Sequence, residues 1–320
     1  MKHFNFSNGD QMPLLGLGTW KLAPESLGPI LREAAKIGYR HFDCAKIYEN
    51  QRAIGDTLRE LLAGGAIRRE EMWITSKLWN DCHSPEDVRP AVEKTLDDLG
   101  LDFLNLYLMH WPVAQKPGVR FPQVGSDFVS LNEIPLSETW AAMEELVGLG
   151  LVRHIGVSNF SVAKIENLLK GASIPPEMNQ VESHPYLQQR EMVQYCQQRG
   201  IAVTGYCPLG SPDRPEHLVG PDDPVLLEDP IITGLAQELG ITPGQLLLAW
   251  AINRRTAVIP KSANFKRLAE NFQAAEITLP DSVMSAISRI DRARRYVSGE
   301  IWTMEGSPYS LESLWDEAGN

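Results

Sequence analysis

The chain has 320 residues, of which 43% are hydrophobic, and its formal net charge is −11 at pH 7. This acidic balance argues against a protein that binds nucleic acid or an acidic membrane surface, although it does not exclude one anionic ligand in a local basic pocket. The first ten residues contain no apolar signal core, and no later run of the sequence is long enough to span a bilayer. We therefore expect a cytoplasmic protein with no membrane partner.

The four cysteines are Cys44, Cys82, Cys196 and Cys207, and none of them has the spacing of a metal finger or a CxxC motif. Cys44 and Cys207 fall in apolar strand patterns, where a small buried thiol is the usual explanation. The seven histidines show no HExxH-like pairing. We assign no metal.

Strand and helix patterns alternate along the chain. A hairpin over residues 2–15, with its turn at Asn8-Gly9, comes first. Eight strand patterns follow, at about 14–20, 41–45, 72–78, 104–111, 154–157, 178–182, 202–207 and 257–260. Helical patterns separate them, for example at 27–37, 84–87 and onward, 137–148, 161–170, 188–198, 230–239, 243–253 and 264–272, and another lies near 281–290.

Strands separated by helices imply parallel pairing, and eight of them imply a closed (β/α)8 barrel of the TIM type. A length of 320 residues suggests two domains, but single barrels of this size are routine, and no linker divides the chain. We expect one α/β domain over residues 1–320, with long loops after strands four and seven and a C-terminal loop. A doubly wound open sheet is the competing architecture, but the first strand–helix turn has no GxGxxG fingerprint.

The second strand carries an acidic residue. Gly38 ends the helical pattern before this strand, and Asn50 can cap the helix after it. Asp43 is then inside an apolar strand and Tyr48 lies just beyond its C-terminal end. A carboxylate is costly there unless a cation or several donors meet it, and a structural ion pair is the alternative to a catalytic role.

Chemistry in a barrel gathers at the C-terminal ends of the strands. Three adjacent strands carry Asp43 and Tyr48, Lys77, and His110 at these ends. The ordinary pKa of tyrosine is near 10, and a lysine ammonium beside a phenol stabilises the phenolate that acid–base chemistry requires. Asp43 would keep Lys77 charged and in place, and His110 would orient a substrate oxygen. Taken singly, such a lysine is usually solvated and such a histidine is usually packed.

The chain resembles the aldo-keto reductases over essentially its whole length. The matching motifs are Gly16-Leu-Gly-Thr-Trp20, Gly38-Tyr-Arg-His-Phe-Asp-Cys-Ala45, Ile74-Thr-Ser-Lys-Leu-Trp79, Leu106-Tyr-Leu-Met-His-Trp-Pro112, Ile155-Gly-Val-Ser-Asn-Phe160, Asn179-Gln180, Gly210-Ser-Pro-Asp-Arg-Pro215 and Ile259-Pro-Lys-Ser262. The resemblance implies a barrel enzyme that reduces aldehydes and some ketones with NADPH, and a tetrad of Asp43, Tyr48, Lys77 and His110.

The same resemblance implies a cofactor site and a substrate site. Nicotinamide would stack on Tyr206, the loop from Gly210 would cover the pyrophosphate, and the start of the last barrel helix would take the 2′-phosphate. The implied cofactor residues are Gly18, Thr19, Trp20, Asp43, Ser158, Asn159, Gln180, Tyr206, Cys207, Leu209, Ser211, Asp213, Lys261, Ser262, Ala263, Asn264, Arg267, Glu270 and Asn271. The implied substrate residues are Trp20, Ile47, Trp79, His110, Trp111, Phe121 and Trp302.

The substrate loops depart from those of well-known aldose-reducing members. Glu216 stands where a tryptophan is common, the tail 299–320 resembles bacterial and fungal members, and the segment 222–226 is similar to plant reductases of aldose 6-phosphates. An aldose or aldose-6-phosphate reductase is therefore one alternative, and a non-catalytic, cofactor-sensing subunit is another. The intact tetrad favours an enzyme, which we expect to be a monomer acting on a small-molecule carbonyl compound.

Overall fold

The computed structural model describes residues 2–65, 67–214, 219–220 and 223–316. The predicted hairpin is present as β1 (His3–Asn5) and β2 (Gln11–Pro13), which pair antiparallel. The strands that follow are β3 (Leu17–Gly18), β4 (His41–Asp43), β5 (Trp73–Leu78), β6 (Leu104–Met109), β9 (Val152–Ser158), β10 (Met178–Glu182), β11 (Ala202–Tyr206) and β12 (Ala257–Val258). They form one eight-stranded sheet whose order is the chain order.

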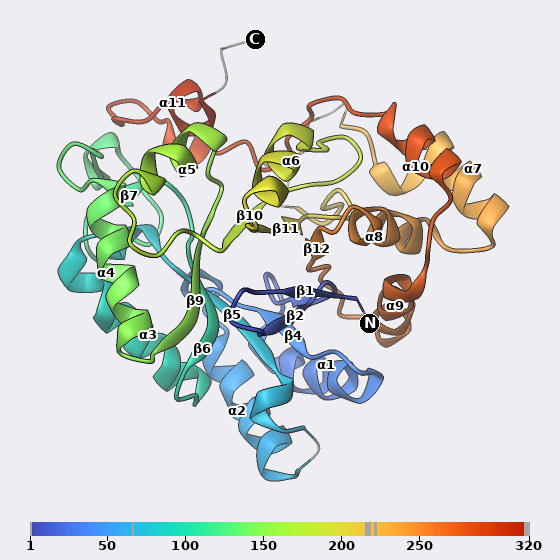
Figure 1. The fold of residues 1–320 in the computed structure, drawn as a ribbon, viewed down its shortest axis with the longest axis horizontal. Helices are drawn as coiled ribbons and strands as arrows, with labels where there is room; N and C mark the ends of the chain where they lie inside the picture. Colours follow the sequence, from blue (N-terminus) through green and yellow to red (C-terminus); the bar gives the residue numbers. More distant parts are fainter. Residues whose placement is uncertain (1, 66, 215–218, 221–222, 317–320) are drawn as a thin grey trace. The chain divides into compact units, whose positions relative to one another are not determined.

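The α-helices occupy the positions between these strands and after the last one (Figure 1). They are α1 (Pro24–Ile37), α2 (Gln51–Ala63), α3 (Pro85–Leu99), α4 (Leu136–Gly148), α5 (Val162–Leu169), α6 (Arg190–Gln198), α7 (Pro230–Leu239), α8 (Pro243–Asn253), α9 (Phe265–Gln273), α10 (Asp281–Ser288) and α11 (Leu311–Trp315). The short 3₁₀ turns are η1 (Lys46–Tyr48), η2 (Arg69–Glu71), η3 (Asn80–Cys82), η4 (Gly125–Asp127), η6 (Leu226–Glu228), η7 (Ala274–Glu276) and η8 (Glu300–Trp302). No helix in the described ranges is both long and apolar enough to cross a bilayer.

The first and last strands of the barrel lie next to each other. Leu15 forms a parallel bridge with Val258, and backbone hydrogen bonds of 2.8 Å join Gly16 N–H to Val258 C=O and Val258 N–H to Leu14 C=O. Gly18 is where this contact is tightest, because a Cβ there would lie 2.5 Å from the carbonyl oxygen of Ile259. The predicted (β/α)8 barrel is therefore confirmed, and a glycine is required where its ends meet.

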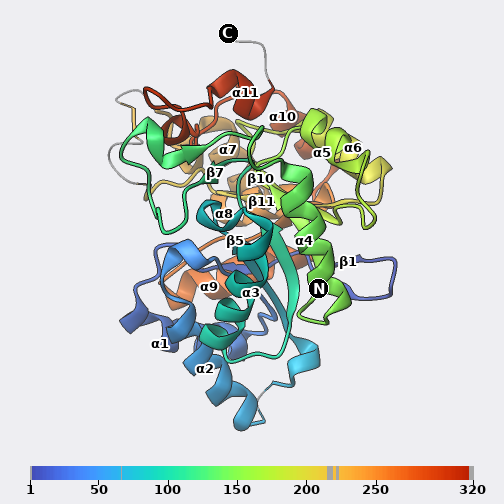
Figure 2. The ribbon, with the colours of Figure 1, turned by 90° about the vertical axis from the view of Figure 1, so that its left-hand side faces the viewer.

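The chain divides into two compact units. The first unit comprises Met1–Gly18, Pro29–Phe42 and Gln180–Val297, and the second comprises Thr19–Gly28, Asp43–Asn179 and Ser298–Asn320. In the second unit β5, β6 and β9 run parallel side by side, and α2, α3 and α4 pack in sequence against one another (Figures 1 and 2). A single domain over the whole chain stays a prediction.

Most predicted boundaries agree with the structure to within a few residues. Gly38 ends α1 with φ of 123°, a conformation that favours glycine. Asn50 is the N-cap of α2, but its side chain makes no capping bond and donates instead to the carbonyls of Thr19 and Leu22. Asn50 is therefore the N-cap residue, as expected, but it makes no side-chain capping bond, because the two bonds that its amide donates orient the side chain toward Thr19 and Leu22. Cys44 is buried as expected, whereas Cys207 lies beyond β11 and is only half-buried.

Two segments expected to be irregular contain regular structure. The long loop after β6 includes a small antiparallel pair, β7 (Ala114–Gln115) with β8 (Phe128–Val129). The tail contains η8 and α11. Glu216, Pro215 and Asp222, which the sequence analysis singled out, lie outside the described residues, as does the end of the tail from residue 317.

Candidate active site

Four titratable side chains meet at the ends of β4, β5 and β6. Asp43 is the last residue of β4, Lys77 is in β5, and His110 follows β6 directly; all three are buried. Tyr48 ends the single turn η1 and is half-buried. The four predicted tetrad residues thus belong to one unit and to consecutive strands.

Lys77 is the centre of this group. Its ammonium donates to the carboxylate of Asp43 and to the carbonyl of Cys44, the latter at 2.9 Å. The same nitrogen lies 5.3 Å from the ring centroid of Tyr48. A charged pair inside the protein must satisfy its hydrogen-bonding groups, and Asp43 with the Cys44 carbonyl does so for Lys77. The ammonium is therefore held close to the phenol ring.

His110 also lies near the phenol of Tyr48. Its ring centroid is 6.1 Å from that of Tyr48 and 5.0 Å from that of Trp79, both in edge-to-face geometry. Burial, and then the positive charge of Lys77, hold the pKa of His110 well below its ordinary value. Its imidazole is therefore neutral near pH 7 and can donate a hydrogen bond while carrying no positive charge.

Aromatic side chains surround this polar group. Trp79 lies 6.0 Å from Phe121 and 5.8 Å from Trp302, measured between ring centroids. Trp111 lies 5.4 Å from Trp302 and 5.9 Å from Trp315. With His110, the structure therefore brings together five of the predicted substrate residues and adds Trp315, which the predicted set did not include.

Two predicted substrate residues stand apart from that cluster. Among the described aromatic residues, Trp20 has no ring contact with the cluster; Lys21 lies over its ring, with the ammonium 4.5 Å from the centroid. Ile47 is half-buried in η1, beside Tyr48 in the chain. Whether either side chain touches a substrate stays a prediction.

The predicted cofactor residues are distributed over both units. In the second unit, Thr19 is buried and its hydroxyl donates to the carbonyl of Asp43 at 2.8 Å. Asn159 has φ of 63°, and its amide donates to the carbonyl of His110 at 3.0 Å and to the hydroxyl of Ser158 at 3.2 Å. Ser158 and Asn159 are thus fixed at the end of β9, directly beside the strand that leads to His110.

In the first unit, the predicted residues lie within β10, at and after the end of β11, and after β12. Gln180 is buried in β10, and Tyr206 is the half-buried last residue of β11. The residues after it include Cys207 and Ser211, both with positive φ, and the half-buried Leu209. This backbone turns sharply as it leaves the barrel.

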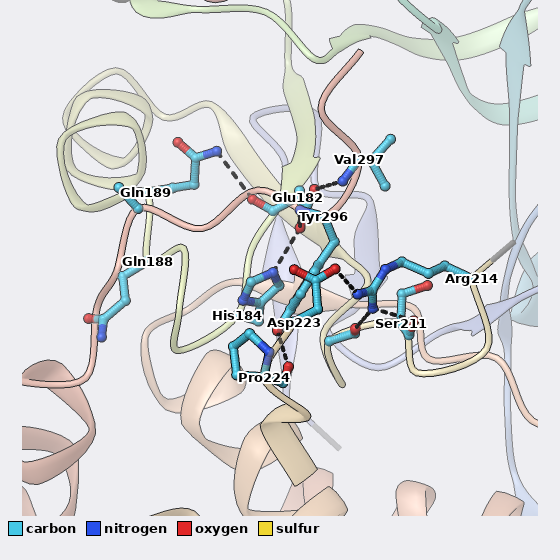
Figure 3. Close-up of polar contacts among 12 residues, drawn as sticks. Glu182, His184, Gln188, Gln189, Ser211, Arg214, Asp223, Pro224, Tyr296 and Val297 are labelled. Carbon is cyan, nitrogen blue, oxygen red and sulfur yellow. Dashed lines mark hydrogen bonds and ion pairs between the residues drawn. The ribbon is translucent and has the colours of Figure 1, made fainter. Parts of the chain in front are cut away.

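The loop that follows β11 is anchored by charged groups. Asp223 binds the guanidinium groups of both Arg214 and Arg294, and Arg214 lies 4.4 Å from the ring centroid of Tyr296. The Tyr296 hydroxyl donates to the carbonyl of Pro224 at 2.8 Å (Figure 3). Arg214 and Asp223 are both buried, so the two ends of the loop are held by a shielded ion pair.

The segment after α10 is anchored to the end of β10. The carboxylate of Glu182 accepts the backbone N–H groups of Tyr296 and Val297 at 2.7 and 2.8 Å, and lies 2.8 Å from Nε2 of His184 (Figure 3). Tyr296 is therefore fixed both by its backbone and by its hydroxyl, and its ring supports Arg214 of the loop.

The start of α9 gathers the cationic residues predicted for the phosphate. Asn264 is the N-cap, and its side chain accepts the N–H of Arg267 at 3.1 Å. Lys261 pairs with Asp213 of the loop after β11 at 2.5 Å. Arg267 is exposed, and no other described residue forms an ion pair with it. Ser262 is buried, Ala263 and Asn264 are exposed, and Glu270 pairs with Lys266 at 3.6 Å.

Comparison with known proteins places this arrangement in a family. The family model described as "Aldo/keto reductase family" matches residues 14–292. The chain is 53% identical over 317 residues to Aldo/keto reductase slr0942 of Synechocystis sp., covering 99% of this chain and 97% of that protein. It is 46% and 45% identical to Aldo-keto reductase family 1 member A1 of Rattus norvegicus and Homo sapiens, in each case covering 90% of this chain and 89% of the relative.

This chain belongs to the aldo/keto reductase family. Membership makes it an oxidoreductase of carbonyl groups and implies a nicotinamide cofactor of the NAD(P)H class.

Several contacts of this aldo/keto reductase were not found from sequence. Lys46 pairs with Asp81 beside Tyr48, and Arg120 pairs with Glu49, the residue after Tyr48. Tyr309 of the tail bonds to β7 and β8. Partners so far apart in the chain leave no local pattern, and only their place after strand ends would have been a signal.

Proposed function

We propose that this aldo/keto reductase reduces aldehydes, and some ketones, to alcohols with NADPH, and that Tyr48 donates the proton. The observation that carries the proposal is the ammonium of Lys77, bound to buried Asp43 and 5.3 Å from the Tyr48 ring. An ammonium beside a phenol stabilises the phenolate that remains after proton transfer. Asp43 keeps that charge in place.

The state of His110 supports the choice of Tyr48 as the acid. Because the pKa of His110 is held well below its ordinary value by burial, the imidazole has no extra proton to give near neutral pH. A neutral imidazole can still donate one hydrogen bond to the carbonyl oxygen and orient it toward the phenol. The two side chains then have separate roles, orientation for His110 and proton transfer for Tyr48.

NADPH, when bound, supplies the hydride that the carbonyl carbon accepts. In our proposal Ser158, Asn159 and Gln180 hold the carboxamide and Tyr206 supports the ring. The described residues at the start of α9 fit a 2′-phosphate, because an exposed, unpaired Arg267 and the N-terminus of a nine-residue helix both favour an anion. Lys261 can contribute from its position before the helix.

The test is Tyr48→Phe, which removes one hydroxyl and keeps the ring. General acid catalysis is typically worth about 10²- to 10⁴-fold, so kcat for an aldehyde should fall by at least about 10²-fold. The Kd for NADPH, measured by fluorescence quenching, should stay within about twofold because no cofactor contact is removed. Tyr195→Phe, the same change on α6, should retain native kcat. A loss below about tenfold for Tyr48→Phe would reject Tyr48 as the acid.

A further inference from the structure

Tyr48 belongs to an element with little stability of its own. η1 has three residues, and the next residue, Glu49, has φ of 55°. Its turn is closed by hydrogen bonds of 3.1 Å from Tyr48 N–H to Ala45 C=O and 3.2 Å from Glu49 N–H to Lys46 C=O. Isolated 3₁₀ turns have poor hydrogen-bond geometry, so side-chain contacts must define where this turn lies.

The first residue of η1 makes such contacts. The ammonium of Lys46 lies 2.9 and 3.0 Å from the two carboxylate oxygens of Asp81 and 3.2 Å from Sγ of Cys82. Sγ of Cys82 also lies 3.2 Å from the carboxylate of Asp81. One ammonium therefore binds a carboxylate through both oxygens and touches a thiol.

This ion pair is partly shielded from water. The side chain of Asp81 is only 10% exposed and that of Lys46 is 38% exposed, whereas both members of the helical pair Arg59–Asp56 are more than 60% exposed. Burial lowers the pKa of Lys46, but the hydrogen bonds and charges of Asp81 and Cys82 together outweigh it, so the pKa lies above its ordinary value. Shielded pairs hold a geometry better than exposed ones, which contribute little.

The pair connects two catalytic elements. Lys46 begins η1, which ends with Tyr48, and Asp81 lies in η3, which begins two residues after the end of β5. β5 carries Lys77. The ion pair thus joins the turn that carries the phenol to the turn that follows the strand with the ammonium.

We propose that Lys46 and Asp81 are positioning residues that hold Tyr48 at its place near Lys77 and His110. This rests on the proposed function, in which Tyr48 gives up the proton. The pair acts through η1: with it broken, the turn is free to shift, and the phenol moves away from the ammonium. Displacements of an ångström at a reacting group lower rates by as much as about 10²-fold, so a smaller shift should cost about tenfold.

The variants are Lys46→Met, Asp81→Asn and the two together, with Lys46→Arg as the conservative change. Lys94→Met is the matched control, because it removes a lysine paired with Asp98 on the exposed face of α3. In Lys46→Met and Asp81→Asn, kcat for an aldehyde should fall about tenfold, while KM and the NADPH Kd stay within about twofold. The double variant should lose no more than the worse single one, because the residues form one interaction. Lys46→Arg should recover most of the loss.

A pH profile separates positioning from simple loss of stability. Among the described residues, the titratable and charged groups near Tyr48 include Asp43, Lys77 and His110, its chain neighbours Lys46 and Glu49, and their partners Asp81 and Arg120. Reduction should slow as pH rises and the phenol loses its proton. In the variants the phenol would lie farther from Lys77, whose charge would then stabilise the phenolate less. The phenol should keep its proton to higher pH, so the alkaline limb of kcat should shift to higher pH.

Titration of the Cys82 thiol, which lies beside Lys46 and Asp81, does not interfere with that pH profile. Burial raises the pKa of Cys82 to about 11, so between pH 6 and 10 the thiol stays largely protonated. A limb within that range therefore reports on the groups around the phenol.

Native kcat and a native alkaline limb in both Lys46→Met and Asp81→Asn would overturn the proposal. An equal loss of kcat in Lys94→Met would also overturn it. So would pair variants that have a lower unfolding temperature but native kcat. If Lys46→Met fails to fold by near-UV circular dichroism, native kcat in Asp81→Asn is by itself decisive against it. An inactive native protein, or an active Tyr48→Phe, refutes the proposed function instead; an active native protein with unaffected pair variants refutes only the positioning role.

Discussion

Lys261 and Asp213 form an ion pair of 2.5 Å between the residue before α9 and the loop after β11. Lys261 was expected to bind the 2′-phosphate of NADPH together with Arg267. Because its charge is already shared with a carboxylate, Lys261 should contribute less to phosphate binding than the exposed Arg267, which forms no ion pair with any other described residue. The pair instead joins the loop to the helix that would hold the phosphate.

The coenzyme prediction follows from this difference. Arg267→Ala should raise the Kd for NADPH by about tenfold, since hydrogen bonds between charged groups contribute roughly 1.5–3 kcal/mol and this site is open to water. The Kd for NADH, which lacks the 2′-phosphate, should change by less than about twofold. Both constants can be measured by quenching of protein fluorescence. Equal losses for the two coenzymes would show that Arg267 has a structural role and that the phosphate binds elsewhere.

The tail prediction concerns Tyr309. Its oxygen accepts the N–H of Ala114 at 2.9 Å and its hydroxyl donates to the carbonyl of Val129 at 2.6 Å, so one side chain bonds to both β7 and β8. Tyr309→Phe leaves these two backbone groups without that partner, at a cost of about 1–3 kcal/mol. The tail that carries Tyr309 and Trp302 should then be held less firmly, so that Trp302 becomes more mobile.

The expected result for Tyr309→Phe is a several-fold higher KM for an aromatic aldehyde, with kcat for a two-carbon aldehyde unchanged. Gly125 and Gly306 approach closely in the same region, since a Cβ on Gly125 would lie 2.2 Å from the carbonyl carbon of Gly306. Gly125→Ala should therefore reproduce the effect by a separate route. Unchanged KM values in both variants would show that the tail does not shape the substrate site.

The main elements of this fold could be predicted because their signals are local. Strands β5 and β6 are buried along their whole length and appear in the sequence as short, partly apolar segments between helical patterns. The pair β7 and β8 was missed because two residues per strand give no periodicity. The helix α11 was missed for the same reason, since five residues hardly exceed one turn.

The proximity of the four predicted tetrad residues could be predicted from sequence because each lies at or just beyond the C-terminal end of a strand of the barrel. The Lys46–Asp81 pair was not, since its members are 35 residues apart and each alone is typical of a solvated loop. The alternative considered for Asp43, a structural ion pair, is also present, because Asp43 does bind Lys77. A structural ion pair and a catalytic role for Asp43 are compatible, because the ion pair places the ammonium of Lys77 beside Tyr48.

Acid should destabilise the protein through its buried histidines. Burial lowers the pKa of His83 to about 4 and, with the charge of Lys77, holds that of His110 well below its ordinary value. Below about pH 6.5 these histidines bind protons in the unfolded chain but not in the folded protein. Their contribution to the free energy of unfolding is therefore fully present above about pH 6.5 and decreases as pH falls toward 4. From pH 7 to 5, His83 alone should remove about 2 kcal/mol.

His83→Gln tests this prediction, because glutamine is polar but does not titrate. The free energy of unfolding, measured with urea at pH 7 and 5, should decrease by about 2 kcal/mol less in the variant than in the native protein. His3→Gln, at an exposed position of β1, is the control and should leave the pH dependence unchanged. An identical pH dependence in native protein and His83→Gln would mean that His83 is protonated in the folded state.

The last prediction concerns the substrate. Trp302 is 2% exposed and its ring contacts those of Trp79 and Trp111, while Trp79 also contacts His110. Aromatic rings next to two polar groups suit a substrate with an apolar body and one carbonyl. Aromatic and medium-chain aldehydes should therefore exceed free aldoses in kcat/KM, because an aldose must bury hydroxyl groups that find few partners among the rings.

Trp302→Ala should lower kcat/KM for an aromatic aldehyde by at least about tenfold, since an aromatic contact and its buried area together exceed 1.4 kcal/mol. For an aldose the same variant should change kcat/KM by less than about twofold. Leu311→Ala, at an exposed position of the same tail, should affect neither substrate. Steady-state rates for both substrates, measured on one preparation of each enzyme, give the ratio of kcat/KM for the aromatic aldehyde to kcat/KM for the aldose. A native preference for an aldose or an aldose 6-phosphate would reverse the assignment, because that specificity requires polar or cationic partners that these rings do not provide.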